Sequence, residues 1–203
     1  TCIREMIAAH YNHPSIYIWG ILNECASDTA YGRECYKTQL ELIKSLDVTR
    51  PRSFSSCRFK TDICFDLVDV VSYNIYPKWY HNTPVAMYLD DLYKWVQTTG
   101  GAGKPFLITE VGAGAIYGYR TPAKVKWSEE YQVLALEEQL GAILSYKDCS
   151  GVYIWQFCDV RVTNDWWNTR PRTMNNKGIV DEYRRPKLSY ETVKRIFRSV
   201  DTY

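Results

Sequence analysis

Short apolar runs alternate with helical patterns along the chain, and this alternation limits the possible folds more than any other feature of the sequence. Within several runs the apolar residues are adjacent, which is typical of strands covered on both faces. Strands that alternate with helices form parallel sheets with right-handed crossovers, so the sequence predicts an α/β fold. The predicted strands lie within residues 15–24, 52–59, 69–77, 105–112 and 151–159, and the predicted helices within 28–46, 84–98, 126–147 and 188–200.

Two α/β architectures fit this alternation, an open doubly wound sheet and a (β/α)8 barrel. An open sheet that binds a nucleotide usually has a glycine-rich turn after its first strand, and the chain has no such turn after residues 15–24. Polar or aromatic side chains instead follow several predicted strands, as they do at the mouth of a barrel. They are Asn23, Glu24, Arg58, Asn74, Tyr76, Glu110, Trp155 and Asp159.

Five strands are too few to close an eight-stranded barrel. We therefore predict that residues 1–203 form the C-terminal portion of a TIM barrel, about strands 4 to 8, as a single domain. The opening residues have the pattern of a helix already under way, so we expect the first barrel strands to lie outside this sequence. Such a portion would have two open sheet edges.

Composition excludes several classes of partner. A net charge of +2, with Lys and Arg spread along the chain, does not favour binding to nucleic acid or to a membrane surface. No apolar run approaches the 18 residues of a membrane span. Seven cysteines without a CxxC pair favour reduced, mostly buried thiols and a cytoplasmic location. With three histidines and no clustered Asp or Cys, we expect no metal and no cofactor.

Two glutamates end predicted strands, and together they indicate a reaction. Glu24 ends the run "ILNE", and Glu110 ends "PFLITE" just before a glycine-containing segment. Strand-end glutamates are singly more often salt-bridge or cap residues. A pair of carboxyl groups at one barrel mouth is what glycoside hydrolysis needs, with one group to protonate the leaving oxygen and one to attack the sugar or activate water.

The two acidic stretches also resemble the two signatures of a known family. "NHPSIYIWGILNE" and "KPFLITEVGAG" are similar to the acid/base and nucleophile segments of glycoside hydrolase family 2, whose members are retaining β-glycosidases. The resemblance continues through "VKWSEEYQ", "GVYIWQFCD" and "NNKGIVDEYRRPK" and is strongest for the β-glucuronidases of the family. It implies a TIM barrel preceded by β domains, β-D-glucuronides as substrates, no cofactor, and a homo-oligomer in the full-length protein.

The resemblance also implies roles for individual residues. Glu24 would be the general acid/base, Asn23 would donate to the sugar 2-hydroxyl, and Glu110 would be the nucleophile. In the matching aromatic segment, Asn74, Tyr76 and Tyr80 would line the pocket. At the remaining positions, Trp155 would form the pocket floor, and the motif Asn175-x-Lys177 would bind the glucuronate carboxylate.

Alternatives remain open at this level. Strand-end Tyr and Trp residues pack against a barrel rim about as often as they stack on a substrate. An "NNKG" stretch read alone would be an exposed turn, and Arg170 and Arg172 beside it stay unassigned. The function could then be that of a β-galactosidase-like enzyme for neutral sugars, or of a non-catalytic fragment that self-associates through its open sheet edges.

Overall fold

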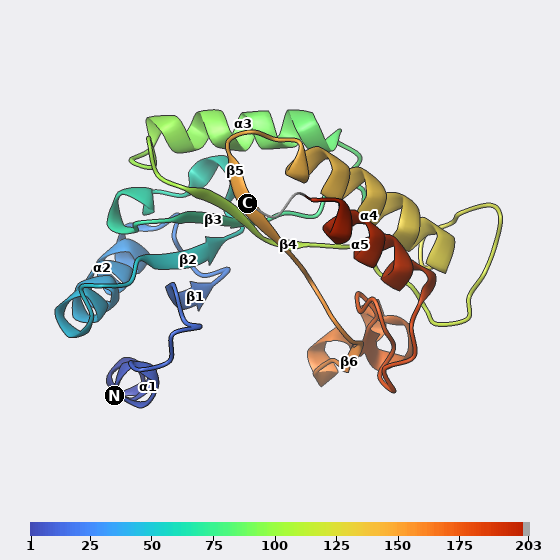
Figure 1. The fold of residues 1–203 in the computed structure, drawn as a ribbon, viewed down its shortest axis with the longest axis horizontal. Coiled ribbons are helices and arrows are strands. Elements are labelled where there is room, and N and C mark those ends of the chain that lie inside the picture. The colour runs from blue at the N-terminus through green and yellow to red at the C-terminus, as the bar shows by residue number, and fades with distance from the viewer. Residues whose placement is uncertain (201–203) are drawn as a thin grey trace. The chain divides into compact units, whose positions relative to one another are not determined.

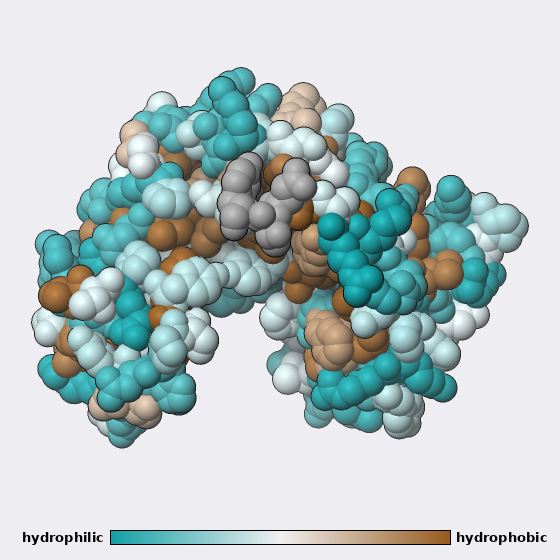
Figure 2. All heavy atoms as spheres, in the orientation of Figure 1, coloured by the Kyte–Doolittle hydropathy of each residue, from teal (hydrophilic) through white to brown (hydrophobic). Residues whose placement is uncertain are grey.

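The computed structural model describes residues 1–200, which divide into two compact units. The first unit comprises residues 1–74, 89–109 and 148–150, and the second comprises residues 75–88, 110–147 and the chain from residue 151. Hydrophilic residues cover much of the face shown in Figure 2, and hydrophobic residues appear between them in small groups.

All five predicted strands form, and each is shorter than the apolar run that predicted it. They are β1 (Trp19–Asn23), β2 (Arg52–Ser56), β3 (Val71–Asn74), β4 (Phe106–Val111) and β5 (Cys149–Ile154). The five belong to one sheet and follow one another in chain order. β1 pairs with β2 and β2 with β3 in parallel, with Trp19 opposite Arg52 and Ser55 opposite Ser72. A doubly wound sheet reverses its strand order, so this order confirms a partial (β/α)8 barrel.

The predicted helices form as well. They are α1 (Cys2–His10), α2 (Ala30–Leu46), α3 (Val85–Thr98), α4 (Glu129–Leu144) and α5 (Leu188–Ser199). The Thr29 hydroxyl accepts from the Gly32 amide at 3.0 Å at the start of α2, and the Ser128 hydroxyl accepts from the Tyr131 amide at 3.2 Å at the start of α4. Such caps contribute about 1 kcal/mol each and define where the helices begin.

Burial on both faces explains the uninterrupted apolar runs. In the first unit all four residues of β3 are buried, and Phe54 of β2 stacks on Phe65 with ring centroids 6.2 Å apart. Tyr73 of β3 also packs against Phe65, with ring centroids 5.3 Å apart. In the second unit α4 and α5 lie side by side (Figure 1).

Several short elements have no counterpart among the predictions. In the second unit, β6 (Val160–Arg161) pairs antiparallel with β7 (Met174–Asn175). The others are the 3₁₀ helices η1 (Phe59–Thr61), η2 (Phe65–Leu67), η3 (Asn164–Thr169) and η4 (Pro171–Thr173). Strands of two residues and short 3₁₀ helices have no apolar run or helical period of their own, so the sequence pattern does not reveal them.

The expectation that the thiols are mostly buried is wrong. All seven cysteines are free, but only Cys64 is buried, whereas Cys2 and Cys57 are exposed and the other four are partly buried. Most of them lie at or beyond the ends of helices and strands, where packing is incomplete. Within residues 1–200, no group of three or more His, Cys, Asp or Glu could hold a metal ion. None of the helices described is long and apolar enough to cross a membrane.

Candidate active site

Glu24 lies at the end of β1 in the first unit, in an unusual backbone conformation. Its amide donates to the Ser55 carbonyl of β2 at 2.9 Å, and its φ angle is 54°. This left-handed region costs a residue other than glycine about 1 kcal/mol, so the neighbouring strand must compensate for it. Backbone outliers of this kind concentrate at functional sites, and the Glu24 residue is exposed.

Asn74, at the end of β3, connects the polar groups of the first unit. Its side-chain nitrogen donates to Asn23 Oδ1 and to Glu24 Oε1, both at 2.9 Å. Its side-chain oxygen accepts from the Thr109 hydroxyl, also at 2.9 Å. Asn74 is buried, with 6% of its surface exposed, and its hydrogen bonds hold the side chains of Asn23 and Glu24 in place.

Glu110 lies near the end of β4 in the second unit. Its main-chain carbonyl accepts from the Ile75 amide at 2.8 Å, and its Oε2 accepts from the Tyr76 hydroxyl at 2.5 Å. A phenol that donates to a carboxylate makes a short, charge-assisted bond. Tyr76, predicted to line a sugar pocket, thus contacts the predicted nucleophile directly.

The glycines after Glu110 are explained by close packing. A Cβ atom on Gly112 would lie 2.4 Å from the Trp155 carbonyl oxygen, which is backbone and has little freedom to move. The Trp155 amide donates to the Val111 carbonyl at 2.9 Å. The chain that follows Glu110 therefore runs tightly against the end of β5.

This packing gives a stability prediction. We expect Gly112→Ala to lower the free energy of unfolding by about 1–3 kcal/mol, because overpacking forces backbone shifts. Urea denaturation measures the change. Gly141→Ala is the matched control, since Gly141 lies in α4 with nothing within 4 Å of its Cβ position and alanine favours a helix. Equal stabilities for the two variants would contradict the prediction.

Lys177 is buried beside three aromatic rings in the second unit. Only 3% of its surface is exposed, and its Nζ lies 2.9 Å from the Tyr80 hydroxyl. The ammonium lies 4.9 Å from the Tyr76 ring centroid, 5.0 Å from that of Tyr80 and 5.7 Å from that of Trp79. The Tyr80 hydroxyl also accepts from Arg170 at 3.1 Å, so two cations converge on one phenol oxygen.

The electrostatics of this cluster favour an anionic ligand. Burial lowers the pKa of the Lys177 ammonium below its ordinary value, while the Tyr80 hydrogen bond and the charges of Tyr80 and Glu110 oppose the change. Burial works to raise the pKa of Tyr80, but hydrogen bonds from Lys177 and Arg170 lower it overall. A ligand carboxylate would add negative charge where two cations share a single phenol oxygen.

Asn175 is the last residue of β7 and lies two positions before the buried Lys177. Its Oδ1 accepts from the Lys177 amide at 3.3 Å, which fixes the turn between the two residues. This bond uses the side-chain oxygen, so the amide nitrogen is the group suited to donate to a carboxylate. Asn176 between them is buried and donates to the Pro171 and Met174 carbonyls.

The structure groups most of the predicted site residues. Within the first unit it brings together Asn23, Glu24 and Asn74, and within the second Tyr76, Tyr80, Glu110, Asn175 and Lys177. Trp155 follows β5 with 39% of its surface exposed. Sequence reasoning missed Thr109, Trp79 and the position of Arg170. Thr109 directly precedes a strand-end acid, which is the one local signal that could have identified it.

The sequence of this chain matches a known protein family and several known proteins. The profile of the family described as "Glycosyl hydrolases family 2, TIM barrel domain" matches residues 1–202. The β-glucuronidase of Rattus norvegicus is 32% identical over 197 residues, which cover 91% of this chain and 29% of that enzyme. The chain therefore spans less than a third of the length of this relative.

Solved structures extend the comparison. A GH2 β-galacturonidase from Eisenbergiella tayi, in a crystal structure bound to galacturonate, is 75% identical, with a TM-score of 0.98 over all of this chain and 37% of that one. A β-D-glucuronidase from Dictyoglomus thermophilum is 28% identical, with a TM-score of 0.90 over 99% of this chain and 35% of that one.

Proposed function

Because the chain belongs to glycosyl hydrolase family 2, we propose that it contributes both catalytic carboxyl groups to a retaining β-glycosidase that cleaves β-linked hexuronides. The observation that carries the choice of an acidic sugar is Lys177, a buried ammonium that shares the Tyr80 hydroxyl with Arg170. A neutral sugar would leave this cationic cluster without an anion, and unpaired buried polar groups discriminate strongly between substrates.

The proposed reaction uses the two glutamates in different roles. Glu110 attacks the anomeric carbon, and Glu24 gives its proton to the glycosidic oxygen, so that the aglycone leaves and a glycosyl ester forms on Glu110. Glu24 then takes a proton from water, which hydrolyses the ester. The Tyr76 hydroxyl orients the attacking carboxylate through its 2.5 Å hydrogen bond.

The remaining residues bind the sugar in this proposal. Asn23 donates to the 2-hydroxyl, and Asn74 supports it by donating to its side-chain oxygen. Asn175 and Lys177 bind the uronate carboxylate, with Tyr80 beside the lysine, and Trp155 forms the floor of the pocket.

Two hexuronides are candidates. β-D-Galacturonides are favoured by the 75% identity to a β-galacturonidase bound to galacturonate. β-D-Glucuronides are the second candidate, favoured by the resemblance of the sequence motifs and by relatives such as the β-glucuronidases at 32% and 28% identity. The two sugars share the carboxylate and differ in the orientation of one ring hydroxyl, so the Lys177 cluster serves either.

The compartment and assembly are also proposals. The seven free thiols support a reducing compartment, which we take to be the cytoplasm. A homo-oligomer of the full-length enzyme is implied by the family resemblance, and sedimentation of that enzyme would test it.

We expect Lys177→Met to remove most of the preference for acidic sugars. In a full-length enzyme that contains these residues, kcat/KM for nitrophenyl β-galacturonide and β-glucuronide should fall roughly 100-fold or more, because the carboxylate loses its charged partner. The value for nitrophenyl β-galactoside should change less than about 3-fold, since a neutral sugar makes no such pair. Steady-state kinetics with the three substrates measure the effect.

Lys194→Met is the matched control for this change. Lys194 lies on α5 and pairs with the exposed Glu191, so all three rates should stay at the wild-type level. Equal losses on acidic and neutral substrates in Lys177→Met would reject the carboxylate-binding role. A wild-type enzyme that prefers the galactoside would reject hexuronide hydrolysis itself.

A further inference from the structure

Behind the proposed carboxylate-binding motif lies an ion pair that the reaction does not use. Lys187, just before α5, and Asp159, just before β6, are joined at 2.8 Å with side chains that are 0% and 1% exposed. We propose that this pair is a positioning device that holds residues 175–178 in the conformation needed to bind the uronate carboxylate. This inference rests on the function proposed above.

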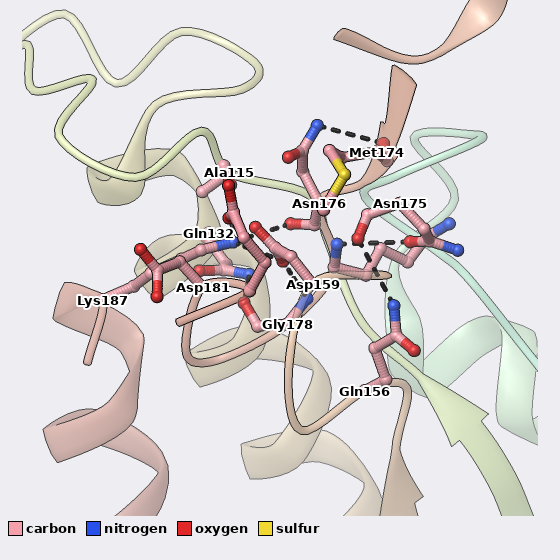
Figure 3. Close-up of polar contacts among 12 residues, drawn as sticks. Ala115, Gln132, Gln156, Asp159, Met174, Asn175, Asn176, Gly178, Asp181 and Lys187 are labelled. Atoms are coloured by element: carbon pink, nitrogen blue, oxygen red, sulfur yellow. Dashed lines mark hydrogen bonds and ion pairs between the residues drawn. The ribbon is translucent and has the colours of Figure 1, made fainter. Parts of the chain in front are cut away.

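The lysine makes every hydrogen bond that an ammonium can donate. Its Nζ donates to Asp159 Oδ1 at 2.8 Å, to the Ala115 carbonyl at 2.6 Å and to the Asn176 carbonyl at 3.1 Å (Figure 3). Three donors meet three acceptors, so the group is fully satisfied and its place is narrowly defined. One of the three acceptors belongs to the residue directly before Lys177.

The aspartate holds the residue on the other side of Lys177. Asp159 Oδ1 accepts from the Gly178 amide at 2.9 Å, so a single carboxylate oxygen contacts both Lys187 and the main chain after Lys177. The two peptide groups that flank Lys177 are therefore both held by the ion pair. Since the direction in which a side chain leaves the backbone is set by those peptides, the pair directs the Lys177 side chain toward the Tyr80 hydroxyl that its ammonium contacts.

The packing around Gly178 leaves little room for adjustment. A Cβ atom there would lie 2.3 Å from the Val180 carbonyl oxygen and 2.4 Å from the Asp159 amide. The Gln132 side chain of α4 donates to the Gly178 carbonyl at 3.0 Å and to the Ala113 carbonyl at 2.8 Å. Ser189 of α5 donates to the same glutamine at 2.7 Å.

The same contacts connect the motif to the segment that follows Glu110. The Ala115 amide donates to the Asn176 carbonyl at 2.8 Å, and Lys187 bonds the carbonyls of both residues. Residues 113–115 come shortly after the strand that carries Glu110. The buried Lys187 ammonium thus holds two segments together. One is the segment that follows the proposed nucleophile, and the other is the proposed carboxylate-binding motif.

Stability alone does not account for such a pair. Burial raises the pKa of Asp159 to about 6, against the charge and hydrogen bond of Lys187, and Asp159 Oδ2 has no hydrogen-bond partner in the part of the chain described. Buried ion pairs are often matched or exceeded in stability by apolar residues of similar volume. Residues that hold a binding group in place are, by contrast, needed where function depends on placement within fractions of an ångström.

The test uses Lys187→Met in a full-length enzyme that contains these residues, with a nitrophenyl hexuronide as substrate. Because removing one partner leaves a buried charge, Lys187→Met/Asp159→Asn is made in parallel. The double variant has no uncompensated carboxylate, and the side-chain amide oxygen that it introduces can still accept from Gly178. KM should rise roughly 10- to 100-fold in both variants, while kcat per folded molecule stays within about 3-fold. Lys194→Met, on α5, should change neither constant.

A merely structural pair would behave differently. Loss of folded enzyme lowers kcat per total protein and leaves KM at its wild-type value, so KM within about 2-fold of wild type in both variants would overturn the proposal. Combination with Lys177→Met provides the second readout. If Lys187 acts through Lys177, the combined variant has the KM of Lys177→Met alone, and independent, multiplicative effects would also overturn it.

The outcomes separate this inference from the proposed function. If wild type shows no preference for hexuronides and Lys177→Met leaves KM unchanged, the proposed function fails and the positioning role fails with it. If Lys177→Met raises KM and the Lys187 variants do not, only the positioning role is rejected.

Discussion

Glu110→Gln is expected to lower kcat on a nitrophenyl hexuronide by at least roughly 10⁴-fold, because an amide cannot form the glycosyl ester. Glutamine has the shape of glutamate, and its carbonyl oxygen can still accept from the Tyr76 hydroxyl, so the fold should persist. Steady-state kinetics on a full-length enzyme that contains these residues measure the loss. Circular dichroism and thermal melting show whether the variant is folded.

A control variant and a labelling experiment make this test specific. Glu137→Gln alters an exposed carboxylate of α4 that pairs with Arg195, and it should leave kcat at the wild-type level. A fluorinated hexuronide that traps the ester should add its mass to a peptide containing Glu110 in the wild type but not in the variant. Turnover of Glu110→Gln within about 10-fold of wild type, or a trapped label on another residue, would reject Glu110 as the nucleophile.

The second large effect is expected at Glu24. Glu24→Gln should lower kcat/KM roughly 10²- to 10⁴-fold for a methyl hexuronide, whose leaving group needs a proton. A dinitrophenyl hexuronide should lose far less in this parameter, because its phenolate leaves without protonation. Glutamine retains an oxygen that can accept from Asn74, so the loss reports on the proton and not on the packing.

The dependence on the leaving group distinguishes catalysis from binding. Equal losses on the two substrates would indicate that Glu24 binds the sugar or supports the fold, and would reject its assignment as the acid. Glu34→Gln is the control, since Glu34 is an exposed residue of α2 in the same unit. Both substrates should then react at the wild-type rate.

The barrel elements were predictable because their signals are local. Apolar spacing within a few residues distinguishes a helix from a strand. The main helices and four of the five predicted strands form within the expected ranges, and β5 overlaps its range but begins at Cys149, before residue 151. The ends of the strands were less predictable. Residues 155–159 continue an apolar run but are not part of β5, which ends at Ile154.

Half of the candidate site was predictable for a related reason. Glu24 and Asn74 lie at or just beyond the ends of β1 and β3, which both pair in parallel with β2 in the first unit, so the carboxyl ends of these strands face the same way. Tyr76 follows β3, and Glu110 lies near the end of β4. Arg170 could not be placed because it lies between the 3₁₀ helices η3 and η4, which have no period to detect. Its contact with Tyr80 joins residues 90 positions apart.

By itself the sequence determined the order of strands and helices and the positions of the acids at strand ends. Only the tertiary structure decided that Asn74 holds Glu24, that Lys177 shares the Tyr80 hydroxyl with Arg170, and that Lys187 and Asp159 hold the chain on both sides of Lys177. The physical reason is the distance along the chain over which each kind of interaction acts. Periodicity depends on neighbours within one or two turns, whereas a hydrogen bond requires two groups from distant segments to approach within about 3 Å in a shared, desolvated environment.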